Sequence, residues 1–108
     1  MIDRAGGYRT QAPTLEAVAA TRGWLLLEFG TDWCGHCIAA QPALQAWALR
    51  HPDIGHLRIE DGRGRPLGRA YRVKLWPTLV LLRDGEEVAR VVRPRDPRDL
   101  HPLEQPLA

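Results

Sequence analysis

The chain has 108 residues, 44% of them hydrophobic, which suits one compact domain with a single core. Its formal net charge of +2 comes from 15 lysines and arginines against 13 acidic residues. This balance argues against a nucleic-acid partner, and apolar runs such as residues 24–27 are far too short to cross a bilayer. We therefore expect a single domain over residues 1–108, without nucleic-acid or membrane binding.

The first half of the chain predicts a strand and a long helix. Pro13 and Thr14 open a short helical stretch that Gly23 ends before an apolar strand. Later, Ile38, Leu44 and Trp47 recur at helical spacing. The expected elements are a short strand at 8–10, a helix at 13–20, a strand at 24–29 and a helix at 34–50.

The second half predicts strands that return as a hairpin. Residues 56–60 alternate apolar and polar side chains, as in a half-buried strand, and Asp84-Gly85 is typical of a tight turn between two strands. Pro102 and Pro106 interrupt the helical pattern at the end of the chain. The expected elements are a strand at 56–60, a short helix at 67–71, strands at 78–82 and 87–92, and one frayed helix at 97–104.

This order of elements defines an α/β fold. A βαβ unit comes first, and a hairpin with a terminal helix, a ββα unit, follows it. We expect a mixed central sheet of about four strands flanked by helices. The sequence shows no internal repeat and no linker.

Both cysteines of the chain lie in the segment Trp33-Cys34-Gly35-His36-Cys37. A disulfide that closes so short a loop constrains the unfolded chain only weakly. Residues 1–20 are interrupted by charges and lack the apolar run of a secretory signal, so we expect a cytoplasmic, reducing location. A structural disulfide is therefore a poor explanation for the pair, and metal binding or redox chemistry remains.

A metal site needs about four ligands, and the chain has no second cysteine pair and no histidine pair at finger spacing. Haem attachment requires a histidine directly after Cys37, where Ile38 stands. An iron–sulfur centre shared by two subunits is a remote alternative that no residue of the sequence indicates. We expect no metal and no bound cofactor.

The two cysteines open the long predicted helix. Amide groups and the helix dipole at a helix start stabilise negative charge, so Cys34 is expected to be the activated thiolate. Cys37 lies one turn further along the same face, where it can bond to Cys34. The pattern predicts one sulfur that attacks and one that completes the exchange.

These residues resemble the thioredoxin superfamily, in which a WCGxC motif joins a buried strand to a helix. Pro42 falls at the place of the family's helix-kinking proline, and Asp84-Gly85 resembles its hairpin. The resemblance covers roughly residues 14–93 and implies a thioredoxin fold. Arg93 departs from it, because many members have a glycine in that part of the docking surface.

The resemblance also implies roles for single residues. Glu28 occupies the place of a buried acid that takes the Cys37 proton, although alternation alone equally allows an outward-facing side chain. Gly35 and His36 resemble the dipeptide of protein disulfide isomerases, and His36 is expected to make the disulfide more oxidising. The expected substrate-binding residues are Trp33, Trp76, Pro77 and Thr78.

The resulting functional prediction is a thiol–disulfide oxidoreductase that reduces or exchanges protein disulfides. Its expected partners are disulfide-containing client proteins and, as electron donor, a thioredoxin reductase or glutathione, with the protein itself a monomer. One alternative is an oxidase or isomerase that runs the reverse step. Another is a non-catalytic binding module whose dithiol senses redox state.

Overall fold

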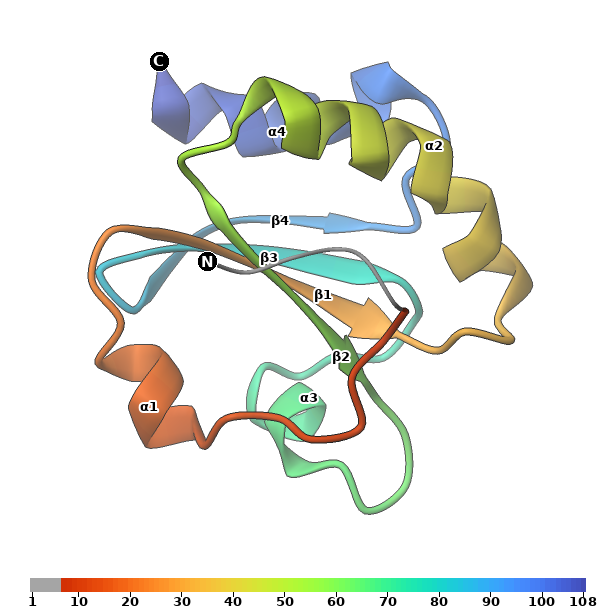
Figure 1. Cartoon of the computed structure of the whole chain (residues 1–108), viewed down its shortest axis with the longest axis vertical. Coiled ribbons are helices and arrows are strands. Elements are labelled where there is room, and N and C mark those ends of the chain that lie inside the picture. The colour runs from red at the N-terminus through yellow and green to blue at the C-terminus, as the bar shows by residue number, and fades with distance from the viewer. Residues whose placement is uncertain (1–6) are drawn as a thin grey trace.

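The structure is a computed structural model that describes residues 7–108. Residues 1–6, which belong to the predicted domain and to the stretch inspected for a secretory signal, lie outside the described part. Figure 1 shows a central sheet between two layers of helices. In chain order the elements are α1 (Leu15–Ala19), β1 (Trp24–Gly30), α2 (Gly35–Arg50), β2 (Gly55–Glu60), α3 (Pro66–Ala70), β3 (Thr78–Arg83), β4 (Glu86–Val92), the 3-10 turn η1 (Pro97–Leu100), α4 (His101–Glu104) and the 3-10 turn η2 (Gln105–Leu107).

The four strands form one mixed sheet in the order β2-β1-β3-β4. Strand β1 runs parallel to β2, with Glu28 opposite Arg58, and antiparallel to β3. The β3–β4 hairpin shifts register between Leu81 and Leu82, so the strand β4 carries a bulge there. The strands and helices thus form the predicted βαβ unit followed by the ββα unit. Strand β1 lies inside the sheet, between β2 and β3.

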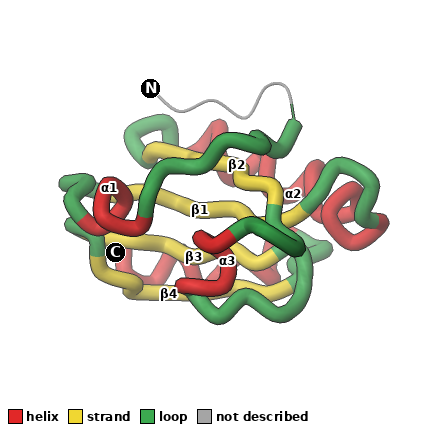
Figure 2. Tube along the Cα trace, turned by 90° about the horizontal axis from the view of Figure 1, so that it is seen from below, coloured by secondary structure: helices red, strands yellow, loops and turns green. Residues whose placement is uncertain are grey.

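Two hydrophobic layers cover the two faces of the sheet. Helices α2 and α4 pack on one face, and α1 and α3 on the other (Figures 1 and 2). Alternate residues of β1 serve the two layers, because successive side chains of a strand point to opposite faces. Leu26 joins Leu44 and Trp47 under α2, whereas Leu27 joins Val18 and Leu67 on the other side.

Helix α2 begins where the sequence analysis places it, with Cys34 as its N-cap and Gly35 as its first residue. Pro42 lies inside this helix on an exposed face. Trp47 is buried, as expected, whereas Ile38 is 58% exposed. The helical spacing therefore identified the helix but not the surroundings of its first turn, where Ile38 faces solvent beside the cysteines.

The two ends of the described chain differ from the predicted elements. The predicted strand at 8–10 is a single bridge, in which Arg9 pairs in parallel with Ile59. The predicted helix at 97–104 is divided into η1 and α4. Pro102 and Pro106 supply no amide hydrogen, so no continuous ladder of helical hydrogen bonds can form there. None of the helices within residues 7–108 is both long and apolar enough to cross a membrane.

Candidate active site

The two cysteines lie at the junction of β1 and α2, and neither forms a disulfide. As the N-cap of α2, the Cys34 sulfur accepts a hydrogen bond from the Cys37 amide at 3.4 Å. Cys34 is 9% exposed and Cys37 only 1%. The sulfur that can be reached from outside is therefore the one at the start of the helix.

The surroundings of Cys34 favour its thiolate. Burial acts in the opposite direction, but hydrogen bonds from the Cys37 thiol and from the amides of Cys37 and His36 outweigh it and lower the pKa of Cys34. The positive charge of Arg93 contributes in the same direction. Cys34 thus carries the properties of an attacking nucleophile.

Cys37 is held in the protonated state. Burial, the hydrogen bond to Cys34 and the charge of Cys34 raise the pKa of the Cys37 thiol to about 12, while the Thr31 amide and the Tyr8 hydroxyl act in the opposite direction. A thiol with this pKa is almost entirely protonated at neutral pH, and only the thiolate attacks a disulfide. Reaction at Cys37 therefore needs a group that removes its proton.

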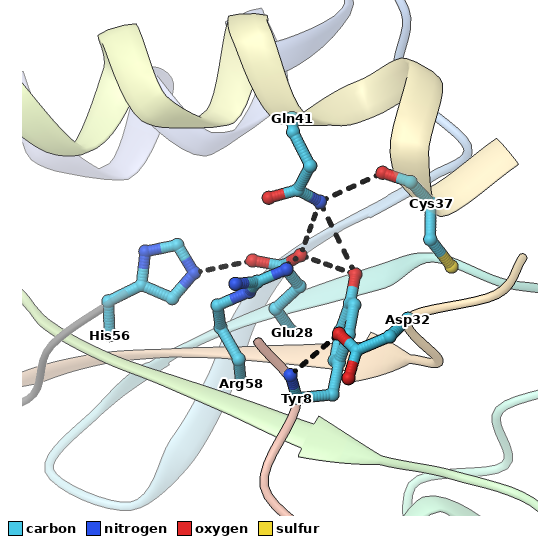
Figure 3. Close-up of polar contacts among 7 residues, drawn as sticks. All are labelled: Tyr8, Glu28, Asp32, Cys37, Gln41, His56 and Arg58. Carbon is cyan, nitrogen blue, oxygen red and sulfur yellow. Dashed lines mark hydrogen bonds and ion pairs between the residues drawn. The ribbon is translucent and has the colours of Figure 1, made fainter. Parts of the chain in front are cut away.

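The family resemblance gives Glu28 the role of removing the Cys37 proton. The Glu28 side chain is fully buried. The Tyr8 hydroxyl donates to its Oε2 at 2.5 Å, and Gln41 Nε2 donates to the same oxygen at 3.0 Å. His56 Nε2 lies 2.8 Å from Oε1, and Arg58 Nε lies 3.4 Å from Oε2 (Figure 3). The outward-facing alternative for Glu28 is excluded, because its side chain lies under α2 among four polar partners.

The sequence analysis assigned no role to Tyr8, Gln41 or His56. The alternation of strand β2 places His56 and Arg58 on one face, and the parallel register brings that face to Glu28. Tyr8 comes from the segment before α1, and Gln41 from the second turn of α2. The alternation in β2 could have indicated His56, whereas no local pattern indicates Tyr8.

Two tryptophans lie beside the dithiol. Trp33 is 74% exposed, and its ring meets that of half-buried Trp76 edge to face, with 5.8 Å between the ring centroids. Trp76 Nε1 donates to Asp61 Oδ2 at 2.8 Å, which fixes the indole. Trp76 also packs against the cluster formed by Tyr8, Cys34 and Cys37. The pair is an apolar surface next to Cys34, and its contact with a client stays a prediction.

The peptide bond between Trp76 and Pro77 is cis. Thr78 is 1% exposed, and its hydroxyl donates to the Leu75 carbonyl at 2.6 Å. The Thr78 side chain therefore stabilises this turn from inside. Gly35 and His36 both lie exposed in the first turn of α2. The proposed substrate and tuning roles of these residues stay predictions.

Arg93 lies against the same turn. Its backbone is in the left-handed region, with a φ of 54°, and its amide donates to the Pro77 carbonyl at 2.8 Å. The side chain folds back so that Nε donates to the Trp76 carbonyl at 2.9 Å. A glycine at this position could not form this side-chain hydrogen bond, and the effect of Arg93 on partner docking stays a prediction.

No cluster of three or more histidine, cysteine or acidic side chains in residues 7–108 is arranged to hold a metal ion. The described site contains the dithiol and the buried polar groups behind it. A low-pKa thiol and a high-pKa thiol within bonding distance can form a reversible disulfide between them.

Comparison with known proteins agrees with this description. The family model for thioredoxin matches residues 9–103. A thioredoxin from Chlamydia trachomatis is 39% identical over 75 residues, which cover 68% of this chain and 72% of the relative. Thioredoxin H2-1 from rice is 35% identical over 68 residues, which are 63% of this chain and 49% of the relative. The chain thus spans about half the length of the rice relative.

Solved structures show the same architecture. Thioredoxin 2 from Pseudomonas aeruginosa PAO1, in its reduced form, superposes with a TM-score of 0.85 and 51% identity over 95% of both chains. A mutant thioredoxin from Halobacterium salinarum gives a TM-score of 0.69 and 33% identity over 89% of this chain and 84% of the other.

The mixed sheet and the dithiol at the junction of β1 and α2 define a protein of the thioredoxin-fold class. Within that class, the chain belongs to the thioredoxin family, because the family model covers most of its length.

Proposed function

We propose that this chain is a thiol–disulfide oxidoreductase that reduces, or exchanges, protein disulfides through Cys34 and Cys37. The observation that carries the proposal is the contrast between the two thiols. Cys34 caps α2, has a lowered pKa and can be reached from outside, whereas Cys37 lies behind it with its proton retained. Such a pair separates the attacking sulfur from the one that completes the reaction.

The reaction proceeds in two exchanges. The Cys34 thiolate attacks one sulfur of a client disulfide, the client S–S bond breaks, and its electron pair leaves on the other client sulfur. In the release step, Cys37 loses its proton and attacks the Cys34 sulfur of the mixed disulfide. The second client thiolate departs, the client has gained two electrons, and the enzyme holds a Cys34–Cys37 disulfide.

Client proteins are proposed to dock over the apolar surface of Trp33 and Trp76 and beside Pro77. The exposed Trp33 ring and the short distance along the chain to Cys34 support this. A thioredoxin reductase or glutathione is the proposed electron donor that returns the disulfide to the dithiol. We further propose a monomeric single domain over residues 1–108 that works in the cytoplasm, where glutathione keeps thiols reduced.

One observation favours a second direction of the same chemistry. His36 lies between the two cysteines on the exposed first turn of α2, where a positive charge would stabilise the Cys34 thiolate and hence the reduced form. A stabilised dithiol makes the disulfide a stronger oxidant. An oxidase or isomerase that donates its disulfide to client thiols is therefore the alternative to a reductase.

Covalent trapping tests the proposal. In Cys37→Ser, the Cys34 thiolate still attacks but the client is not released, so mixed disulfides with client proteins accumulate under mild oxidation. Cys34→Ser is the matched control and should trap nothing. The expected result is a set of adducts that disappears on reduction. If Cys37→Ser collects no more adducts than Cys34→Ser, the chain is not an oxidoreductase of this kind.

The same variants separate catalysis from redox sensing. A binding module should form a stoichiometric complex even with both cysteines replaced by serine, because its affinity comes from the fold. An oxidoreductase should lose all measurable turnover in that double variant. Turnover is measured by the rate of insulin reduction, monitored as turbidity. Complex formation is measured by size-exclusion chromatography of the double variant with a client protein that the trapping experiment identified.

A further inference from the structure

Tyr8 connects the two groups between which a proton has to pass in the release step. Its hydroxyl donates to Glu28 Oε2 at 2.5 Å and, on its other side, lies next to the Cys37 sulfur above Gly30. In the view of Figure 3 the hydroxyl lies between the carboxyl group and the sulfur. Tyr8 is 6% exposed and packs in one cluster with Cys34 and Cys37.

The backbone at Gly30 makes room for this arrangement. A Cβ atom at Gly30 would lie 2.6 Å from the Cys37 sulfur and 2.9 Å from the Tyr8 hydroxyl oxygen, which is too close for either. Both atoms therefore lie directly over this glycine, at the end of β1. Only a residue without a side chain leaves room for both the phenol and the thiol there.

We propose that Tyr8 relays the proton of Cys37 to Glu28 when Cys37 attacks the mixed disulfide. This inference rests on the oxidoreductase function proposed above and assigns a catalytic role to a residue outside the dithiol motif. In the relay, the Tyr8 O–H proton moves to Glu28 Oε2 while the Cys37 S–H proton moves to the Tyr8 oxygen. The phenol is neutral before and after.

The step balances in atoms and electrons. The Cys37 sulfur forms a bond to the Cys34 sulfur, the bond from Cys34 to the client sulfur breaks, and the electron pair leaves with the client thiolate. The proton from Cys37 ends on the Tyr8 oxygen, and the proton from Tyr8 ends on Glu28. Glu28 then passes its proton to solvent or to the client thiolate after release. The client disulfide is the oxidant, so no further reactant is needed.

Burial and the Glu28 carboxylate keep the Tyr8 phenol protonated, although Arg58 acts in the opposite direction. Burial raises the pKa of Tyr8 most, and the charge of Glu28 and its hydrogen bond with the hydroxyl raise the pKa further. Arg58 stacks its guanidinium 4.3 Å from the centre of the Tyr8 ring, and it also contacts Glu28 from β2, as His56 does. Asp32, before α2, accepts the Tyr8 amide at 3.0 Å. A phenol that stays neutral can accept one proton only by passing on another.

A two-phase thiol assay tests the relay. An excess of a symmetric aromatic disulfide such as dithiobis(nitrobenzoate) releases one chromophore when Cys34 attacks and a second when Cys37 completes the release step. In Tyr8→Phe the ring remains but the hydroxyl is gone. We expect the release step at neutral pH to slow by about tenfold or more, since general acid–base groups contribute roughly 100-fold or more. The attack by Cys34 should change by less than about threefold, well below that range.

The pH profile distinguishes a relay from a structural role. Without an internal base, the rate of release in Tyr8→Phe depends on the small fraction of Cys37 thiolate, which rises about tenfold per pH unit below its pKa. The difference from wild type should therefore shrink as the pH rises. A variant that merely misplaces Cys37 would remain slower by the same factor at every pH, and that result would overturn the proposal.

Tyr71→Phe is the matched control, because Tyr71 is the other tyrosine of the chain and packs against Phe29 on the opposite layer. Both phases should keep their wild-type rates in this variant. If Tyr8→Phe also matches wild type in the release step, the relay is wrong although the oxidoreductase function stands. If wild type shows no second phase at all, the proposed function itself fails.

A second measurement covers the case in which Tyr8→Phe does not fold. In wild type the relay moves two protons in the release step, one from Cys37 to Tyr8 and one from Tyr8 to Glu28. The rate of this step in mixtures of H2O and D2O should therefore show a curved dependence on the deuterium fraction, whereas the attack by the Cys34 thiolate transfers no proton. A linear dependence of the release step means that a single proton moves and contradicts the relay.

Discussion

Glu28 is the residue at which the buried polar groups of β1, β2, α2 and the N-terminal segment meet. Replacing Glu28 by glutamine keeps the shape but removes the proton acceptor. We expect Glu28→Gln to slow the release step at neutral pH by roughly tenfold or more, with a much smaller effect on the attack by Cys34. The two-phase aromatic disulfide assay measures both rates in one experiment.

Combining this change with Tyr8→Phe asks whether both residues act on one proton. Residues that act as a unit give strongly non-additive losses. The double variant should therefore be about as slow in the release step as the slower single variant. Losses that multiply would mean that Glu28 and Tyr8 serve Cys37 independently.

His36 is the residue that sets this dithiol apart from one with proline at the same position. Its exposed ring lies in the first turn of α2, where it can stabilise the Cys34 thiolate. Replacement by proline should lower the reduction potential by some tens of millivolts, because about 30 mV corresponds to about 1.4 kcal/mol. Equilibration with glutathione at neutral pH measures the potential. Equal potentials for wild type and His36→Pro would make the histidine a bystander.

The dithiol could be predicted from the sequence because its chemistry is local. Cys34, Cys37 and the start of α2 are neighbours in the chain, and the helix start explains which sulfur is activated. The Tyr8 hydroxyl could not be predicted, since 20 residues separate it from Glu28 and no periodic pattern joins them. His56 was assigned no role, because its partner follows from the register of β1 and β2 rather than from its own segment.

At the scale of single elements, the end of β1 is the most sensitive point of the site. Gly30→Ala puts a methyl group 2.6 Å from the Cys37 sulfur and 2.9 Å from the Tyr8 hydroxyl. Overpacking of this kind costs typically about 1–3 kcal/mol. We expect the free energy of unfolding of the reduced protein to fall by this amount, measured by guanidinium unfolding.

Gly35→Ala is the matched control for stability. A Cβ atom there would meet no heavy atom within 4 Å, and alanine favours the first turn of a helix. This variant should be at least as stable as wild type. If Gly30→Ala were equally stable, Tyr8 and Cys37 would not be as tightly packed over β1 as described.

The strands and α2 could be predicted because their patterns are long and are bounded by turn residues. Alternation of apolar and polar side chains predicted strand β2, and the Asp84-Gly85 turn predicted the hairpin of β3 and β4. The end of the chain could not be predicted in detail. Prolines there divide the helical segment into η1, α4 and η2, and the packing of Leu100 and Leu103 against the core is not visible in a local pattern.

For the whole molecule, the two buried groups with raised pKa values predict a loss of stability in alkali. The unfolded chain releases the Cys37 and Tyr8 protons near their ordinary pKa values of 9.0 and 10.0, whereas the folded chain keeps them. The stabilisation is therefore complete below these values and falls as the pH rises above them. Each group contributes a decrease of up to about 1.4 kcal/mol per pH unit.

The slope is obtained by measuring the free energy of unfolding of the reduced protein at several pH values between about 8 and 11. Cys34 should not add to the decrease, because its pKa is lowered in the folded chain, so the folded chain releases this proton more readily than the unfolded chain does. Tyr8→Phe and Cys37→Ser should each lose less stability than wild type over the same interval. A slope that is the same in all three proteins would contradict the assignment of the two protons.

The attachment of Tyr8 to the sheet has a consequence for partial opening of the molecule. The segment at 7–10 is held by Arg9, whose amide donates to the Arg58 carbonyl at 3.0 Å and whose carbonyl accepts the Glu60 amide at 2.8 Å. So short an attachment can detach at a lower free energy than global unfolding. Low concentrations of urea should then abolish the release step while Cys34 still attacks at its normal rate. The enzyme would pass through a state in which it captures clients covalently but does not let them go.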